Sequence, residues 1–214
     1  MKINNDKTKV ILFNMSQKYR FPPEVTLSDG EILEVTDTTK ILGVIVSNTL
    51  KWSKNTDHIT SKAFNKIWIL RQLQKLGFGK DFILDVYMKE IRSILEYCVP
   101  VWSGAITQKE SQKIENIQKI VLRVLLKHQY SSYTDACRQF HLEKLHNRRR
   151  KLCVKFSNKE YKKPDHGIFK KIHSKSKRRL NKKVVTEPKA RTERYYKSAI
   201  PYLSRLLNSH INQT

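Results

Sequence analysis

The sequence lacks the acidic pairs that metal-dependent phosphoryl transfer requires. Such chemistry needs carboxylates that hold two metal ions about 3.5–4 Å apart, usually on a hairpin between apolar strands. Asp81 and Asp85 are one helical turn apart on a polar face, whereas Glu31 and Glu34 would point to opposite faces of a strand. Nucleophile motifs such as Gly-x-Ser-x-Gly and phosphate-binding glycine loops are also missing. We therefore do not expect the chain to be an enzyme on its own.

Cysteines and long apolar runs are scarce as well. Cys98, Cys137 and Cys153 are odd in number and do not have the spacing of a disulfide framework. The N-terminus carries no apolar run typical of a signal peptide, and no stretch approaches the ~18 apolar residues of a membrane helix. We expect an intracellular protein, nuclear or cytoplasmic, with reduced thiols and no membrane contact.

One segment combines cysteine with histidine. Cys137, His141, His146 and Cys153 lie within 17 residues, but the spacing C-x3-H-x4-H-x6-C matches no common zinc module. The segment also has the pattern of a continuous helix, without the tight turn that usually holds one ligand pair. We favour Cys137 and Cys153 as small buried apolar side chains and expect no bound metal. One equivalent of zinc in the purified protein would contradict this interpretation.

Acidic residues are few, above all toward the C-terminus. The chain has 43 Lys and Arg against 19 Asp and Glu, a formal charge of +24. Residues 148–214 hold 21 of those cations and only 4 of the acids. Because such a charge repels itself in the compact state unless a polyanion neutralises it, nucleic acid is the expected partner.

Short β-branched and aromatic runs predict strands in the first 50 residues. Residues 7–13 form one run, which Phe21-Pro22-Pro23 cannot continue. Residues 25–27 and 31–35 flank Asp29-Gly30, where glycine supplies the positive φ of a tight hairpin turn. Residues 40–46 predict a further strand.

From about Thr56 apolar residues recur every three or four positions, which predicts helices. Thr107 and Glu110 form a capping box, in which hydroxyl and carboxylate bind each other's free amides at a helix start. Beyond Lys162 the basic, proline-interrupted pattern predicts partial order at best. The expected helices cover residues 56–74 up to Gly77 and Gly79, 81–98 up to Pro100, 108–127, 132–140, 142–159 and about 195–207.

The predicted fold class is α+β, mainly α. It comprises a small antiparallel β-sheet at the N-terminus, a helical bundle and a basic, partly ordered tail. Four parts are expected, namely residues 1–52, 53–130, 131–160 and 161–214.

Basic side chains of the first predicted helix, and the tryptophans, could contact nucleic acid. His58, Lys62 and Lys66 are spaced about 6 Å apart on a face opposite the apolar stripe, and such a line can follow phosphates. A solvated basic face would have the same pattern. The tryptophans could stack on the bases of single strands, but we expect Trp68 and Trp102 in the core.

Two denser cationic runs lie nearer the C-terminus. One is Arg148-Arg149-Arg150-Lys151, and the other covers residues 175–183 with Lys177, Arg178 and Arg179. The four acidic residues of this region cannot neutralise all these cations. We expect both runs to bind phosphates with an affinity that falls steeply with salt, although the second could equally serve nuclear import.

Several segments resemble the C-terminal part of non-LTR (LINE- or jockey-like) retrotransposon reverse transcriptases. Residues 5–13 (NDKTKVILF) resemble the strand called motif D, which follows the catalytic aspartates. Residues 39–46 (TKILGVIV), Leu50-Lys51-Trp52 and His58-Ile59 resemble the primer grip and the start of the thumb. Residues 142–149 (LEKLHNRR) and 194–208 resemble the post-thumb helices and the C-terminal end of such proteins.

The resemblance implies a fragment of an RNA-directed DNA polymerase whose fingers and aspartate-bearing palm would precede Met1. Lys7 would match the motif D lysine but would have no aspartates beside it, so the chain would not be active alone. It would bind no cofactor itself, whereas the complete polymerase would need Mg²⁺. Leu42 and Gly43 would shape the primer grip beside Lys51, because a small residue lets backbone approach the primer end.

Three functions are compatible with these features. The first is a nucleic-acid-binding fragment that holds RNA, DNA or their hybrid through the backbone, without base-specific contacts. In the second, a longer gene product supplies the palm and the chain completes a polymerase. The third is a domesticated basic interaction module with no polymerase role. The sequence does not indicate an oligomeric state.

Overall fold

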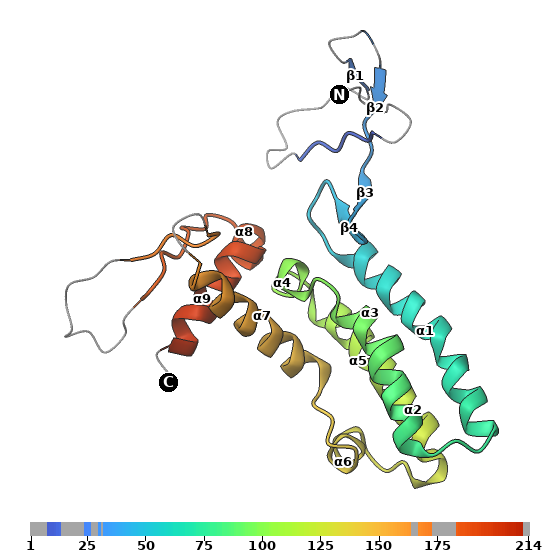
Figure 1. Ribbon diagram of the computed structural model, residues 1–214. Coiled ribbons are helices and arrows are strands. Elements are labelled where there is room, and N and C mark those ends of the chain that lie inside the picture. The colour runs from blue at the N-terminus through green and yellow to red at the C-terminus, as the bar shows by residue number, and fades with distance from the viewer. Residues whose placement is uncertain are drawn as a thin grey trace. The chain divides into compact units, whose positions relative to one another are not determined.

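The computed structural model describes residues 8–13, 24–26, 30, 32–163, 167–172 and 183–211. The chain divides into two compact units, residues 1–58 and 59–214, and the boundary falls inside the first long helix. The part of the chain described is mainly helical, with short antiparallel hairpins near the N-terminus (Figure 1). The predicted class, α+β and mainly α, is confirmed.

Two hairpins replace the single small sheet that the sequence predicts. The first hairpin forms between the predicted strands, and Gly30 adopts the expected positive φ, +84°. The strand expected over residues 40–46 is two strands, because Leu42 and Gly43 both have positive φ, 46° and 89°, and reverse the chain. Residues 8–13 contribute one bridge, between Val10 and Val35, instead of the strand expected over 7–13. The strands are β1 (Glu24–Thr26) paired with β2 (Ile32–Glu34), and β3 (Thr38–Ile41) paired with β4 (Val44–Ser47).

Polar contacts join the second hairpin to the start of the first helix within the same unit. The Ile45 amide donates to Oδ1 of Asn55 (3.1 Å), and the Ser47 hydroxyl donates to the Lys51 carbonyl (2.9 Å). Trp52, which lies between Lys51 and Asn55 in the sequence, is buried. The backbone of β4 is therefore attached directly to α1 through Asn55, and Ser47 binds the segment that connects them.

The helices confirm most of the sequence prediction. The capping box is present: the Glu110 amide donates to the Thr107 hydroxyl (3.2 Å), and the Thr107 amide donates to the Glu110 carboxylate (2.6 Å). Gly77 has a φ of +81° just past the first helix. The helical elements are α1 (Ser53–Lys75), α2 (Lys80–Val86), the π-helical segment η2 (Tyr87–Arg92), α3 (Ser93–Glu96), α4 (Val99–Trp102), α5 (Gln108–Leu126), the 3₁₀ turn η3 (Lys127–Gln129), α6 (Tyr133–Gln139), α7 (Leu145–Tyr161), α8 (Glu193–Lys197) and α9 (Ala199–Ile211).

The helix expected over residues 81–98 departs from the prediction at its end. It widens into the π-helical segment η2 and finishes at Glu96, two residues before Cys98, whose φ is +50°. Pro100 does not end this helix but lies in the first turn of α4. A proline is tolerated there because the first amides of a helix have no intrahelical partner.

The described part of the C-terminal region packs on the helical core. α9 packs against α7 and α4 (Figure 1), and Leu203 and Leu207 are buried there. Asn208 fixes the preceding segment to α9, since its Oδ1 accepts from the amides of Val184 (2.9 Å) and Val185 (3.2 Å). Its Nδ2 also donates to the Val185 carbonyl (3.1 Å). The single helix expected over 195–207 is two helices, α8 and α9, separated at the extended residue Ser198, and the apolar face of α9 is part of the core.

Candidate functional site

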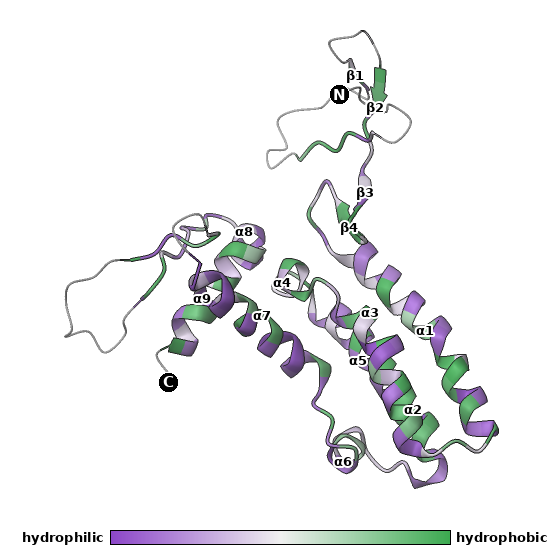
Figure 2. Cartoon of the chain, in the orientation of Figure 1, coloured by the Kyte–Doolittle hydropathy of each residue, from purple (hydrophilic) through white to green (hydrophobic). Residues whose placement is uncertain are grey.

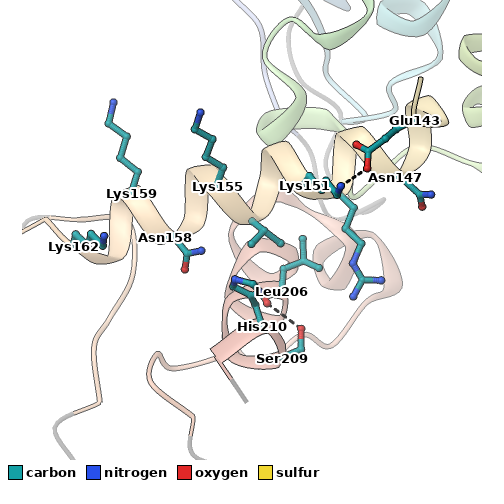
Figure 3. A pocket seen from close by; sticks show the side chains of 12 residues that line it. Glu143, Asn147, Lys151, Lys155, Asn158, Lys159, Lys162, Leu206, Ser209 and His210 are labelled. Carbon is teal, nitrogen blue, oxygen red and sulfur yellow. Dashed lines mark hydrogen bonds and ion pairs between the residues drawn. The ribbon is translucent and has the colours of Figure 1, made fainter. Parts of the chain in front are cut away.

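A groove of about 860 Å³ lies between α7 and α9 (Figure 3). α7 supplies most of its lining, and Figure 2 shows that helix to be predominantly hydrophilic. Among the described residues that line the groove, Glu143 is the one acidic side chain. The cations of the lining are Arg150, Lys151, Lys155, Lys159 and Lys162.

Helical spacing places four of these cations, Lys151, Lys155, Lys159 and Lys162, on one side of α7. At 3.6 residues per turn they fall within about 80° of one another and extend over about 17 Å, whereas Arg150 points about 100° away from Lys151. The opposite side of α7 is buried and packs against the neighbouring helices, through residues that include Arg149, Cys153 and Ser157. The core therefore fixes the direction in which the cationic side faces.

Four of these cations extend into solvent. The side chains of Arg150, Lys155, Lys159 and Lys162 are exposed and form no hydrogen bond or ion pair with another described residue. Figure 3 shows Lys155 and Lys159 projecting in the same direction from one edge of α7, while Asn158 points to the side on which α9 lies. These charges are available to an anionic ligand.

The floor of the groove is apolar, and its far wall is polar. Val154 of α7 and Leu206 of α9 form the floor, while Ser209 and His210 come from α9. Asn147 and Asn158 add side-chain amides along α7. The groove thus offers positive charge at its rim, hydrogen-bonding groups on its walls and apolar contact between them.

The run Arg148-Arg149-Arg150-Lys151 is not one surface, contrary to the sequence prediction. Arg148 forms a two-point ion pair with Glu96 of α3, Nε to Oε1 at 2.5 Å and Nη2 to Oε2 at 2.9 Å. Hydrogen bonding to Glu96 raises the pKa of Arg148. Lys151 is paired with Glu143. Because neighbours on a helix point about 100° apart, four successive cations cannot share a face.

Arg149 has the most unusual environment of the four. Its residue is only 3% exposed, Nη2 donates to the Ser111 hydroxyl (2.6 Å), and Nη1 has no partner among the described residues. Burial lowers the pKa of this guanidinium. Arg149 is therefore a buried structural residue and not the phosphate contact that the sequence predicts.

A buried carboxylate on α5 holds the N-terminus of α7. Glu115 accepts hydrogen bonds from the amides of Leu145 (2.9 Å) and His146 (3.1 Å), which have no intrahelical partner. The Tyr133 hydroxyl donates to the same carboxylate (2.5 Å), and burial raises the pKa of Tyr133. Lys144, the N-cap residue of α7, supplies no side-chain cap. Glu115 replaces that cap and so positions the cationic helix.

The line His58, Lys62 and Lys66 on α1 is less available than predicted. Lys66 forms an ion pair with Glu90 of η2 (2.5 Å), whereas Lys62 is exposed. Each step of four residues advances about 40° beyond a full helical turn, so the line drifts toward the apolar stripe. It begins opposite the core at His58 and ends beside the core at Lys66.

The burial of the tryptophans differs in part from the prediction. Trp102 is buried, as expected, and its Nε1 donates to the Tyr97 carbonyl (2.9 Å). Trp68, which we expected in the core, is 59% exposed. It follows Ile67 by one position and therefore points about 100° away from that buried side chain. Phe64, one turn earlier, is exposed as well.

The residues carried over from the resemblance are only partly described. Leu42 and Gly43 form the exposed tip of the β3–β4 hairpin, where Leu42 is 86% exposed, and Lys51 is exposed before α1. Lys7, Lys177, Arg178 and Arg179 lie outside the described residues.

In the described part of the chain, no three His, Cys, Asp or Glu side chains gather in a way that could hold a metal ion. Cys137 and Cys153 are buried, which confirms their interpretation as core side chains, and burial raises the pKa of Cys153 to about 12. None of the described helices has the length and apolar character needed to span a bilayer.

Sequence reasoning missed Lys155, Lys159 and Lys162, which form most of the groove's cationic rim. The signal was present, because Lys151, Lys155 and Lys159 recur every four residues as His58, Lys62 and Lys66 do. The partner wall on α9 was not readable from spacing, since it lies about 50 residues further along the chain. Comparison with protein-family models, curated proteins and solved structures finds no match for this chain.

Proposed function

We propose that this chain binds nucleic acid through phosphates along the cationic side of α7. The observation that supports it most is the charge imbalance of the groove, five cations against Glu143 alone among its described lining residues. Phosphate contacts of lysine and arginine carry no base information, so binding is expected to be independent of sequence.

The resemblance to non-LTR reverse transcriptases supports the same ligand class. We propose on that basis that the chain is the thumb and C-terminal extension of such an enzyme, without catalytic aspartates of its own. Reading the gene upstream tests this part: a frame continuous with Met1 that encodes Phe/Tyr-x-Asp-Asp supports it. An unrelated upstream sequence favours the domesticated basic module instead.

A charge-neutralising variant tests the phosphate-binding site. In Arg150→Gln/Lys155→Gln/Lys159→Gln/Lys162→Gln, the slope of log affinity against log salt should fall by about 3 to 4, since each phosphate contact contributes about 0.9. Fluorescence anisotropy of labelled nucleic acid with the full chain, from roughly 0.05 to 0.3 M salt, measures it. Circular dichroism verifies that the variant is folded.

The matched control removes four charges elsewhere. Arg71, Lys75, Lys109 and Lys189 are exposed, form no ion pair with a described residue and do not line the groove. Replacing all four with glutamine should lower the slope by less than about 1. Equal losses in the two variants would mean that net charge, not the α7 face, binds. Absence of binding at about 0.15 M salt by the unmodified chain would contradict the function.

A further inference from the structure

An aromatic ring stacked with a cation links α8 and α9. The guanidinium carbon of Arg205 is 3.5 Å from the centroid of the Tyr196 ring. Nη2 of Arg205 also donates to the Tyr196 carbonyl (2.8 Å), so two contacts hold the guanidinium plane over the ring. Tyr196 is nevertheless 48% exposed. The pair is a preformed flat surface that remains open to solvent.

α9 carries both the arginine of the pair and part of the groove lining. Arg205 directly precedes Leu206, which forms part of the groove floor, and Tyr202 lies one turn earlier on α9. Burial raises the pKa of Tyr202, and the charges of Arg150, Arg149 and Arg205 oppose that rise. Arg150 at one end of the groove and Arg205 of the stacked pair therefore act on the same ring.

The chemistry of the groove discriminates between paired and unpaired strands. A duplex presents phosphates outward and keeps the faces of its bases stacked inside, so it would cover the cations and leave Val154 and Leu206 without apolar contact. An unpaired strand can place phosphates along a cationic rim while its bases stack on aromatic rings or on arginine planes. The amides of Asn147 and Asn158 can accept and donate hydrogen bonds to exposed base edges.

We propose that the α7–α9 groove binds a single strand of nucleic acid, with its phosphates along α7 and one base stacked on the Arg205–Tyr196 pair. The proposal rests on the proposed function and narrows its ligand to unpaired DNA or RNA. An acidic peptide could match the charge of the rim, but it has no flat base to stack on the pair.

The test compares an oligothymidylate of about 12 nucleotides with the duplex that it forms with oligoadenylate, using the full chain. The single strand should bind at least about tenfold more tightly than the duplex. Tyr196→Leu keeps an apolar side chain but removes the ring, and should weaken single-strand binding about tenfold while duplex binding is unchanged. Arg205→Lys keeps the charge but removes the planar group, and should produce the same selective loss.

Tyr195→Leu is the matched control. Tyr195 adjoins Tyr196 and is 44% exposed, but no described cation stacks on its ring, so both affinities should stay unchanged. The inference is overturned if duplex binds as tightly as single strand, or if Tyr196→Leu and Tyr195→Leu behave alike. In that case the four-glutamine variant of α7 tests the proposed function separately. If this variant has a reduced salt slope, phosphate binding along α7 still holds. If its slope is unchanged, phosphate binding along α7 is rejected as well.

Discussion

Arg149 and Arg150 are adjacent in the sequence and have opposite roles in the structure. The guanidinium of Arg149 is enclosed between α7 and α5, whereas Arg150 is exposed at the rim of the groove. A cation contributes to phosphate binding only where the ligand can approach it. Position on the helix, rather than membership of a basic run, therefore decides which arginine is accessible to a phosphate.

We predict that Arg150→Gln lowers the salt slope of nucleic-acid binding by about one, the contribution of one phosphate contact. Arg149→Met, which keeps the length of the side chain but removes its charge, should leave the slope unchanged. Anisotropy titrations at several salt concentrations measure both variants. An equal decrease for the two would contradict the assignment of Arg149 to the interior.

Gly104 is required for steric reasons, between α4 and α5. A Cβ atom at this position would lie 2.5 Å from Cγ and 2.6 Å from Cδ1 of Tyr202, closer than such atoms approach one another. Tyr202 is half-buried on α9, and the close contacts fall on Cβ and the base of its ring rather than on the far end of a flexible side chain. Contact between the α4–α5 turn and α9 therefore depends on the missing side chain.

We predict that Gly104→Ala lowers the free energy of unfolding by about 1–3 kcal/mol, the usual cost of overpacking. Gly79→Ala is the control, since Gly79 has an ordinary φ of −62° and no atom within 4 Å of an added Cβ. Its effect should stay below about 1 kcal/mol. Urea denaturation followed by circular dichroism measures both, and equal midpoints would refute the steric explanation.

At the scale of elements, α7 depends on two helices that precede it. Glu115 of α5 satisfies its first amides, and Glu96 of α3 binds Arg148 one turn later. α9 then packs along the other side of α7. These contacts hold the helix in a fixed rotation about its axis and keep the lysines on the groove side.

We predict that Glu115→Ala lowers the free energy of unfolding by about 2–4 kcal/mol, because three donors lose a charged acceptor and two of them are helix-start amides. Asp85→Ala removes the partner that Asp85 of α2 provides for Lys89 in a solvent-exposed ion pair. This variant should lower the free energy of unfolding by less than about 0.5 kcal/mol. Chemical denaturation gives both values. A cost for Glu115→Ala as small as that of Asp85→Ala would mean that the carboxylate does not anchor α7.

Elements that begin or turn at a short sequence motif could be predicted from the sequence. Features that depend on residues distant in the sequence could not. Thr107 and Glu110 determine the start of α5 within four residues, and the glycine of the β1–β2 turn acts in the same way. The environment of Arg148 depends on Glu96, 52 residues away, and no spacing rule reveals it. The π-helical widening of η2 has no sequence signal that we can identify.

At the scale of the whole molecule, a formal charge of +24 opposes compaction. The ion pairs of the described residues join side chains within units but leave most of the lysines exposed. We predict that the melting temperature rises with sodium chloride from roughly 0.02 to 0.3 M, because salt screens this repulsion. Differential scanning fluorimetry measures the shift, and heparin should raise the melting temperature further by binding the folded state.

A flat or falling melting temperature over that range would mean that the ion pairs outweigh the repulsion. The α7 variant with four glutamines supplies the internal comparison. Because it carries four fewer charges, its melting temperature should depend less on salt than that of the unmodified chain. The heparin-induced shift should also be smaller.

Only part of the candidate site could be predicted from the sequence. The asymmetric distribution of basic residues indicated a C-terminal binding region, and the groove lies within it. The groove itself arises from the packing of α9 on α7, which the basic and proline-containing tail pattern did not suggest. Buried side chains such as Leu203 and Leu207 determine that packing, and their partners lie about 50 residues earlier.

The attachment of α7 to Glu115 also sets an order of events during folding. The amides of Leu145 and His146 are 30 and 31 residues from the carboxylate that receives them, so α5 must form before the first turn of α7 is satisfied. Loop closure over such distances is slower than the growth of a single helix. We therefore expect the cationic side of α7 to be assembled after α5, so that a nascent chain carries these cations before they form an ordered row.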